Sequence, residues 1–311
     1  MARVNLAVFN SMAPATIVPS LPFVFRSTEH MRRVLDGPIG DEILASMDAE
    51  GFIGLCFYDM GARSFYSRKG PIHSVDDMKG LAVRVQPSDI SVETFKAMGA
   101  RPVAVPFDRV TAALKAGVVD ASENSWAGYV SAGHDRVARY YSLTEHSMMP
   151  GVLVFSKRVW SELSPDDRRT VRAAAKESVS FMRGKLDSYE VSARLKAEQS
   201  GSEVVDTVTR KSFADVLTPL YPKLLPDPAL RAMIKQVHKP TPKPPAYLDG
   251  PAYLDGKGRR THKGGMRRRL LLSGSLAAAL PWSARRRPHV SLDPVHRNSL
   301  SRRLSALARA R

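Results

Sequence analysis

Apolar and polar positions alternate along residues 1–238 in a way that predicts short strands separated by helices. Short apolar runs typical of buried strands occur near residues 1–9, 52–58, 64–66, 81–85, 102–105, 118–120 and 140–155. Helical patterns, in which apolar residues recur three and four positions apart, fill most of the segments between these runs. Strands that alternate with helices favour an α/β fold with mainly parallel sheets, and such folds bind ligands beyond the carboxyl ends of their strands.

The longest helical pattern covers residues 164–199. It starts with Ser-Pro-Asp-Asp, which supplies an N-cap, a proline at the first helical position and acidic residues in the first turn. We expect this helix to be long enough to bridge two lobes. Shorter helices are expected at residues 28–49, with a break at Gly37-Pro38, and at residues 125–137.

The basic charge of the chain is concentrated at its carboxyl end. The formal net charge is +17, and residues 241–311 hold 16 Lys and Arg against three acidic residues. Prolines and two copies of Pro-Ala-Tyr-Leu-Asp-Gly open this segment, and they favour an extended linker over a helix. We therefore expect residues 239–311 to be a disordered or spurious Pro/Arg-rich tail. Polyanion binding by the tail is an alternative, but nucleic acid is not expected as a partner, because the arginines show no regular interleaving with aromatic residues.

Conventional catalytic and cofactor motifs are absent from the sequence. It contains no P-loop, Gly-x-Gly-x-x-Gly, Gly-x-Ser-x-Gly or His-Glu-x-x-His pattern, so no cofactor and no metal are expected. The single cysteine, Cys56, excludes an internal disulfide, and its apolar neighbours predict an inert core thiol. An alternative function is an enzyme that uses Glu123 or Asp120 as an acid or base. The only support for it is that these two carboxylates are close together in the sequence.

Arginines at the ends of predicted strands are the most informative polar residues. Arg84 interrupts the apolar run Leu-Ala-Val-Arg-Val, so it either faces solvent or meets an anionic partner in a cleft. Arg63 follows another strand through a flexible glycine, and two guanidinium groups could hold one carboxylate. Asn124 follows a strand and could add an amide hydrogen bond, while Phe107 and Trp126 could form apolar or stacking walls.

Several segments together resemble the DctP-type solute-binding proteins of tripartite ATP-independent periplasmic (TRAP) transporters. The resemblance covers about residues 1–238 and is carried by Ser20-Leu21-Pro22-Phe23, Gly61-Ala62-Arg63-Ser64-Phe65-Tyr66, Asp77-Met78-Lys79-Gly80-Leu81-Ala82-Val83-Arg84-Val85, Met98-Gly99-Ala100, Ala112-Ala113-Leu114-Lys115-Ala116-Gly117-Val118-Val119-Asp120 and Glu123-Asn124. The resemblance assigns the signature arginine, which pairs with the ligand carboxylate, to Arg84 and a second cleft arginine to Arg63. It assigns the supporting amide to Asn124 and an aromatic wall to Phe107. The chain departs from the family pattern at Ala121, where glycine is usual.

The resemblance implies an α/β, two-lobed periplasmic binding protein-like fold with a long bridging helix. Lobe I is expected to consist of residues 1–61 and 150–189, and lobe II of residues 62–149 and 190–238. Family members begin with a signal peptide and further strand–helix units. This chain carries no signal-peptide pattern. Against the family pattern it is expected to start inside the N-terminal lobe, so this lobe is expected to be truncated.

The implied function is capture of an organic acid anion and its delivery to the membrane permease subunits of a TRAP transporter, not catalysis. The two lobes would close around the ligand in a hinge motion. The segment at residues 140–150 is similar to the branch that is associated with sugar acids such as uronates, and a C4-dicarboxylate is the other candidate. A periplasmic location follows from the resemblance, and a monomer is expected.

Overall fold

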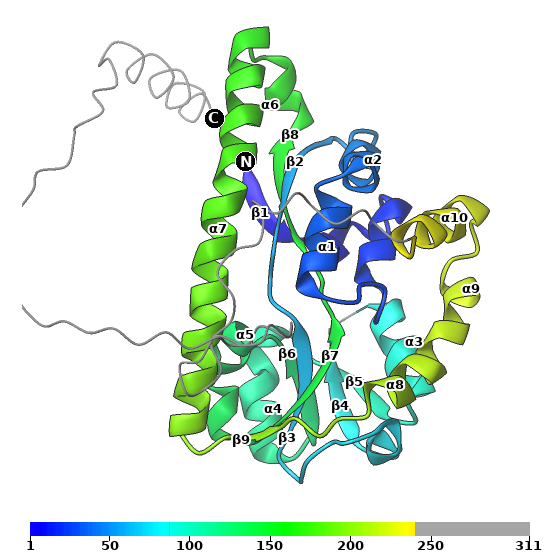
Figure 1. Cartoon of the computed structure of the whole chain (residues 1–311), viewed down its shortest axis with the longest axis vertical. Coiled ribbons are helices and arrows are strands. Elements are labelled where there is room, and N and C mark those ends of the chain that lie inside the picture. The colour runs from blue at the N-terminus through cyan, green and yellow to red at the C-terminus, as the bar shows by residue number, and fades with distance from the viewer. Residues whose placement is uncertain (87, 240–311) are drawn as a thin grey trace, which may run out of the picture. The chain divides into compact units, whose positions relative to one another are not determined.

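The computed structural model describes residues 1–86 and 88–239, which form a mixed α/β structure with two sheets (Figure 1). The three-stranded sheet contains β1 (Ala2–Asn5), β8 (Gly151–Ser156) and β2 (Phe52–Tyr58), in that order. The six-stranded sheet contains β5 (Arg101–Ala104), β4 (Ala82–Val85), β6 (Ala121–Asn124), β3 (Arg63–Ser67), β7 (Tyr140–Ser147) and β9 (Glu203–Val205). The helices of the described residues are α1 (Thr28–Leu35), α2 (Pro38–Ser46), α3 (Asp89–Ala97), α4 (Val110–Ala116), α5 (Trp126–Ser131), α6 (Lys157–Ser161), α7 (Pro165–Gln199), α8 (Arg210–Leu217), α9 (Tyr221–Leu224) and α10 (Pro228–Val237). The predicted α/β class is confirmed, and the predicted tail lies, apart from Lys239, outside the described residues.

The pairing of the strands corrects the prediction of mainly parallel sheets. Strands β1 and β2 both pair antiparallel with β8, and β3 pairs antiparallel with β6 and β7. The parallel pairs of the described residues are β4–β5, β4–β6 and β7–β9. The prediction was wrong because the chain passes directly from β2 to β3, and back from β7 to β8, with no helix between them. These two crossings run in opposite directions and join the two sheets.

Two predicted elements are shorter than their apolar patterns suggested. The first strand ends at Asn5, whose side-chain oxygen accepts a hydrogen bond from the Ala7 amide at 2.9 Å and caps a 3-10 turn. This turn buries both Leu6 and Phe9 in the core, which a continued strand would not do. The helix predicted at residues 125–137 ends after Ser131, because Gly133 adopts a positive φ of 67° and starts a separate 3-10 turn.

Helix α7 is the predicted long helix and spans 35 residues. Its N-cap, Ser164, accepts a hydrogen bond from the Asp167 amide at 3.1 Å. The helix packs against β2 of the three-stranded sheet and against α5 beside the six-stranded sheet (Figure 1). It therefore runs alongside both sheets, as the sequence predicted. Neither α7 nor any other described helix is apolar enough over a sufficient length to cross a membrane.

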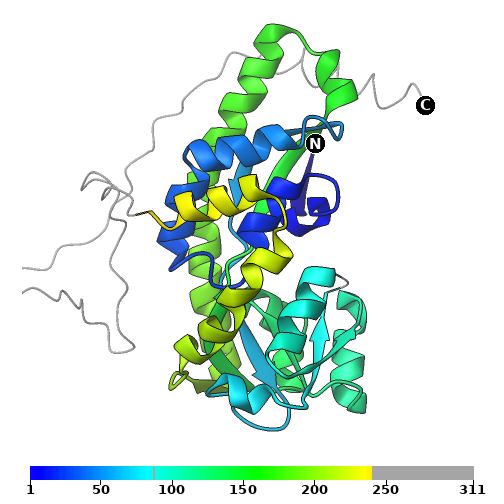
Figure 2. The same cartoon turned by 90° about the vertical axis from the view of Figure 1, so that its right-hand side faces the viewer.

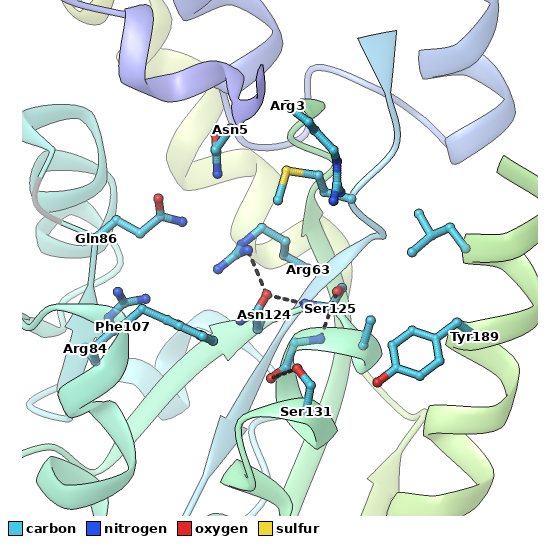
Figure 3. Close-up of a pocket in the computed structure, with 14 residues that line it drawn as sticks. Arg3, Asn5, Arg63, Arg84, Gln86, Phe107, Asn124, Ser125, Ser131 and Tyr189 are labelled. Atoms are coloured by element: carbon cyan, nitrogen blue, oxygen red, sulfur yellow. Dashed lines mark hydrogen bonds between the residues drawn. The ribbon is translucent and has the colours of Figure 1, made fainter. Parts of the chain in front are cut away.

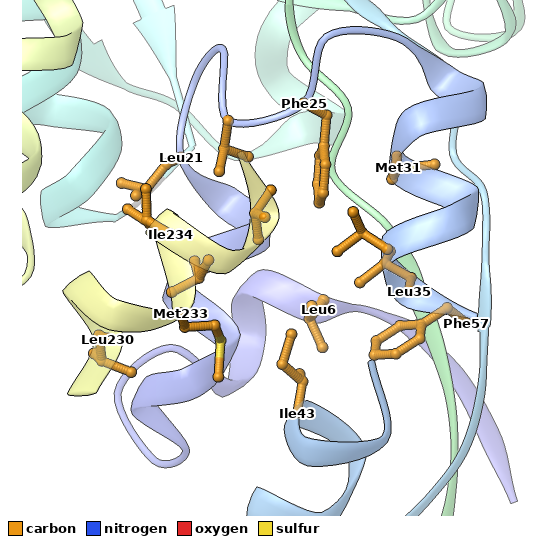
Figure 4. Packing of buried hydrophobic residues seen from close by; sticks show 14 of the residues in the cluster. Leu6, Leu21, Phe25, Met31, Leu35, Ile43, Phe57, Leu230, Met233 and Ile234 are labelled. Carbon is orange, nitrogen blue, oxygen red and sulfur yellow. The ribbon is translucent and has the colours of Figure 1, made fainter. Parts of the chain in front are cut away.

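One hydrophobic cluster brings the two ends of the described chain together (Figure 4). Met233 and Ile234 of α10 pack in the same cluster as Leu6 and Ile43. Figure 2 shows α10 beside α1 and α2, although these helices are far apart in sequence. The apolar face of α10 is thus buried among N-terminal residues.

Candidate functional site

A cavity of about 570 Å³ lies between the two sheets and is the candidate site. In Figure 3, residues of the six-stranded sheet form its lower wall, and residues of β1 form its upper wall. We call Arg63, Arg84 and Asn124 the lower wall, and Arg3 and Asn5 the upper wall. Met60 of the β2–β3 crossing and Tyr189 of α7 also line the cavity. Its position between two sheets that are joined by crossings is typical of ligand sites at domain interfaces.

Arg84 is a buried cationic side chain of the cavity that has no charged partner among the described residues. It lies in β4, where the side chain is only 3% exposed, and its Nε donates a hydrogen bond to the Val105 carbonyl at 2.9 Å. In the described part of the chain, no carboxylate lies within ion-pair distance of its guanidinium. Burial lowers the pKa of Arg84, although the carboxylate of Glu123 acts in the opposite direction. A buried cation of this kind gains from an incoming anion, since charge-assisted hydrogen bonds are strong where water is excluded.

Arg63 lies in the same wall, but its charge is already neutralised. It sits at the start of β3, where its Nε and Nη2 donate to the two carboxylate oxygens of Glu123. Its Nη1 donates to Asn124 Oδ1 at 2.9 Å. Burial by itself lowers the pKa of Arg63, and the contact with Glu123 more than offsets this, so the pKa is raised. Arg63 therefore keeps its proton and contributes shape and hydrogen-bond donors more than net charge.

Glu123 is held as a carboxylate by the same ion pair. Burial raises its pKa, but Arg63 and His146 outweigh this effect and place the pKa at about 2. The His146 Nε2 atom lies 3.7 Å from Glu123 Oε2, and its ring stacks on Phe65 at 4.3 Å. Burial lowers the pKa of His146. The lower wall thus rests on a buried polar network whose ion pair is complete without a ligand.

Asn124 connects this network to the next helix. It ends β6, and its Oδ1 accepts hydrogen bonds from Arg63 and from the Ser125 amide, both at 2.9 Å. Its side chain packs directly on Gly128 of α5, where an added Cβ atom would lie 2.4 Å from it. Glycine at 128 is therefore required by the close approach of Asn124. The amide is fixed at a strand–helix junction, as the sequence predicted.

The two predicted aromatic residues have different surroundings. Phe107 lines the cavity, is 50% exposed and makes an edge contact with His134 at 5.7 Å between ring centroids. Trp126 instead stacks on Tyr141 at 3.6 Å in the hydrophobic interior, so it supports the site from behind and is not one of its walls. Burial, followed by the charge of Arg84, lowers the pKa of His134 to about 4. His134 therefore adds no positive charge beside Arg84 at neutral pH.

The remaining sequence predictions concern Cys56, a metal site and the acidic residues Glu123 and Asp120. Cys56 is buried, and burial raises its pKa to about 11, which fits an unreactive core thiol. Within residues 1–86 and 88–239, no group of three His, Cys, Asp or Glu side chains could hold a metal ion. Asp120 accepts a hydrogen bond from the Ala82 amide and pairs with Lys69, both at 3.0 Å. Glu123 is likewise held in its ion pair. Both of the acidic residues that an enzyme could have used as an acid or base therefore have a structural role.

The upper wall was missed by the sequence analysis. Arg3 and Asn5 line the cavity from β1, and Gln86 lines it from the segment after β4. Arg3 interrupts the apolar run Ala-Arg-Val-Asn-Leu in the same way as Arg84 interrupts its own strand. The interrupted apolar run therefore marked Arg3 in the same way as Arg84. Because the two residues are far apart in sequence, this pattern did not show that both line one cavity.

Comparisons with known proteins agree with this geometry. The family model DctP, described as bacterial extracellular solute-binding protein, family 7, matches residues 1–226. The chain belongs to this family. Its members are binding proteins and not enzymes, and the solved relatives are TRAP periplasmic solute-binding proteins, so the chain is a TRAP solute-binding protein.

Solved relatives of this TRAP solute-binding protein contain sugar acids. One from Bradyrhizobium sp. BTAi1, in complex with α/β-D-galacturonate, is 47% identical, with a TM-score of 0.73 over 76% of this chain and 78% of that chain. One from Xanthobacter autotrophicus Py2, with bound β-D-galacturonate, is 46% identical with the same TM-score and coverage. The C4-dicarboxylate-binding periplasmic protein DctP of Rhodobacter capsulatus is 28% identical over 207 residues, which cover 66% of this chain and 62% of that protein.

Proposed function

We propose that this TRAP solute-binding protein captures a sugar acid of the uronate class and delivers it to the membrane permease subunits of its transporter. The carboxylate of the ligand pairs with Arg84, and Arg63 and Asn124 donate further hydrogen bonds. The single observation that carries this proposal is the Arg84 guanidinium, which is buried in a cavity and has no charged partner among residues 1–86 and 88–239. A uronate is favoured over a C4-dicarboxylate, because the relatives that contain galacturonate are 46–47% identical and the dicarboxylate-binding relative is 28% identical.

The proposal includes the location of the protein and the motion of its parts. Capture takes place in the periplasm, and the permease recognises the closed, ligand-bound form. Lobe I consists of residues 1–61 and 150–189 with α9 and α10, and lobe II of residues 62–149 and 190–217. The protein acts as a monomer. Closure bends the β2–β3 and β7–β8 crossings, which are the strand connections between the sheets.

Isothermal titration calorimetry and thermal unfolding with a panel of acids test the proposal. D-Galacturonate or D-glucuronate should raise the melting temperature of the wild-type chain by about 5–10 °C at 100 times the dissociation constant, because a ligand stabilises the state it binds. Succinate and fumarate should bind more weakly. Arg84→Ala should weaken uronate binding by at least about 100-fold, since it removes the cation of a desolvated charge pair.

Arg158→Ala is the matched control, because Arg158 is exposed and is not among the residues that line the cavity. It should leave both the affinity and the melting temperature shift unchanged. A wild-type chain that binds no uronate, or an Arg84→Ala variant that binds as tightly as wild type, would refute the proposal. Tighter binding of succinate than of either uronate would replace the uronate class with the C4-dicarboxylate class.

A further inference from the structure

The upper wall contains two polar side chains that the proposed carboxylate site does not use. Arg3 and Asn5 are two positions apart in β1, so they project from the same face of the strand. Val4 and Leu6 face the hydrophobic cluster on the other side. Figure 3 shows Arg3 and Asn5 pointing into the cavity from above, across from Arg63 and Asn124. The alternation of β1 thus presents two polar groups to the same cavity that Arg84 lines at the other wall.

The hydrogen bond of Asn5 fixes which of its atoms faces the cavity. Its Oδ1 accepts from the Ala7 amide at 2.9 Å, so the side-chain oxygen is occupied as the cap of the 3-10 turn. The oxygen can accept a second hydrogen bond, but the NH₂ group makes no hydrogen bond with the described residues and is the donor that is available to a ligand. Asn5 is therefore a neutral hydrogen-bond donor whose orientation the backbone determines.

The Arg3 side chain extends beside Asn5 toward Gly151 of β8, which is the register partner of Asn5. A Cβ atom at Gly151 of β8 would lie 3.5 Å from Arg3 Nε and 3.4 Å from Met60 Sδ. The guanidinium stem thus passes over Gly151, next to the β2–β3 crossing. In the described part of the chain, Arg3 makes no ion pair and no side-chain hydrogen bond, so its donors are available to a ligand.

We infer that Arg3 and Asn5 bind the hydroxyl and ring oxygens at the end of the ligand remote from Arg84, and that they are specificity-determining residues. This inference rests on the proposed function. A uronate has a single carboxylate, which Arg84 already serves, and its remaining oxygens are hydrogen-bond acceptors that match the donors of the upper wall. Arg3 is exposed and Asn5 is half-buried. Closure of the lobes around the ligand would bury their donors, and an acid that lacks these oxygens would leave the donors unpaired. The ligand class is therefore a polyhydroxylated monocarboxylic acid.

Titration calorimetry on upper-wall variants of the full chain tests this inference with D-galacturonate, succinate and galactarate as probes. Asn5→Asp keeps the oxygen that caps Ala7 but replaces the NH₂ donor by a second oxygen. Arg3→Ala removes the guanidinium. Arg3→Lys keeps the positive charge but lacks the planar pair of parallel N–H donors of the guanidinium. We expect Arg3→Ala and Asn5→Asp each to weaken D-galacturonate binding by about 10- to 100-fold, with a smaller loss for Arg3→Lys. The preference for D-galacturonate over succinate should fall by a similar factor.

Three results would overturn the inference, and they differ from one another. If wild type binds D-galacturonate and Arg84→Ala abolishes it, but Arg3→Ala and Asn5→Asp stay within about twofold of wild type, the proposed function stands and the upper wall has no role in specificity. If galactarate binds more tightly than D-galacturonate and Arg3→Ala removes that preference, Arg3 binds a second carboxylate instead of hydroxyl groups. If wild type binds no uronate at all, the proposed function fails and the inference fails with it. Arg158→Ala serves again as the control that should match wild type.

Discussion

The two walls of the cavity differ in how their polar groups are held. In the lower wall, Arg63 donates to both oxygens of Glu123 and to Asn124, and these groups are buried. In the upper wall, Arg3 is exposed and makes no side-chain hydrogen bond within the described residues. The lower wall is therefore part of the folded interior, whereas the upper wall adds donors that only a ligand engages. Substitutions in the two walls should separate stability from binding.

The largest expected effect comes from breaking the ion pair in the lower wall. Glu123→Ala leaves the Arg63 guanidinium buried and unpaired, which should lower the free energy of unfolding by about 3–5 kcal/mol. Urea unfolding monitored by circular dichroism measures this loss. Glu162→Ala removes an exposed carboxylate and should leave stability nearly unchanged. Equal stabilities of the two variants would show that the network does not hold the lower wall.

Acid should weaken the same ion pair. The pKa of Glu123 lies at about 2 in the folded chain, below the ordinary value of 4.5, because Arg63 and His146 outweigh the effect of burial. A depressed carboxyl pKa stabilises the fold above the unfolded-state pKa, and this stabilisation is lost as the pH falls from about 4.5 to about 2. The stability advantage of wild type over Glu123→Gln should therefore shrink by about 3 kcal/mol across this window. Urea unfolding of both proteins at half-unit pH steps measures it. A constant difference between them would contradict the assignment.

A smaller loss is expected where the lower wall meets α5. Gly128→Ala would place a Cβ atom 2.4 Å from the Asn124 side chain, so Asn124 must move away from Arg63. We expect a destabilisation of about 1–3 kcal/mol, which is typical of overpacking. Gly184→Ala in α7 is the matched control, because nothing lies within 4 Å of its added Cβ atom. That control should gain about 0.5–1 kcal/mol from helix propensity, and a loss in both variants would point to a general intolerance of the substitution.

The sequence predicted much of the lower wall and none of the upper wall. Arg63, Arg84 and Asn124 stand at ends of predicted strands, where α/β folds gather their ligand-binding groups, and family motifs surround them. The ion pair between Arg63 and Glu123 was not predicted, because it depends on the antiparallel pairing of β3 with β6. Mainly parallel sheets were expected, and that pairing follows from the direct crossings between the sheets. Local sequence pattern carries no information on such a crossing.

Long-range packing explains the other differences between prediction and structure. The predicted long helix was correct over its whole length, because its N-cap and its apolar spacing are local signals. The position of α10 among the N-terminal residues was not predicted, since an amphipathic helix does not specify which apolar surface it will cover. Arg3 was missed for a similar reason. Only the tertiary fold brings β1 to the cavity that Arg84 lines.

Arg84 should behave unlike its neighbour Arg63. Since burial lowers its pKa and no carboxylate of the described residues pairs with it, Arg84→Met should change the stability of the ligand-free chain by no more than about 1 kcal/mol in either direction. The same substitution should abolish the stabilisation by D-galacturonate. Thermal unfolding with and without ligand measures both quantities. A large loss of stability without ligand would mean that Arg84 holds the fold together, and its role in the proposed carboxylate site would then need a different explanation.

The smallest effect on stability is expected in the upper wall. Arg3→Ala removes an exposed side chain that makes no ion pair among the described residues, so the unfolding free energy without ligand should change by less than about 0.5 kcal/mol. With D-galacturonate at a fixed concentration, however, the melting temperature of Arg3→Ala should rise less than that of wild type, because the linked stabilisation depends on affinity. Equal shifts at concentrations near the wild-type dissociation constant would remove Arg3 from the site. An unchanged unfolding free energy with a smaller melting temperature shift would show that Arg3 acts in ligand binding and not in stability. This property separates the upper wall from the buried network of the lower wall.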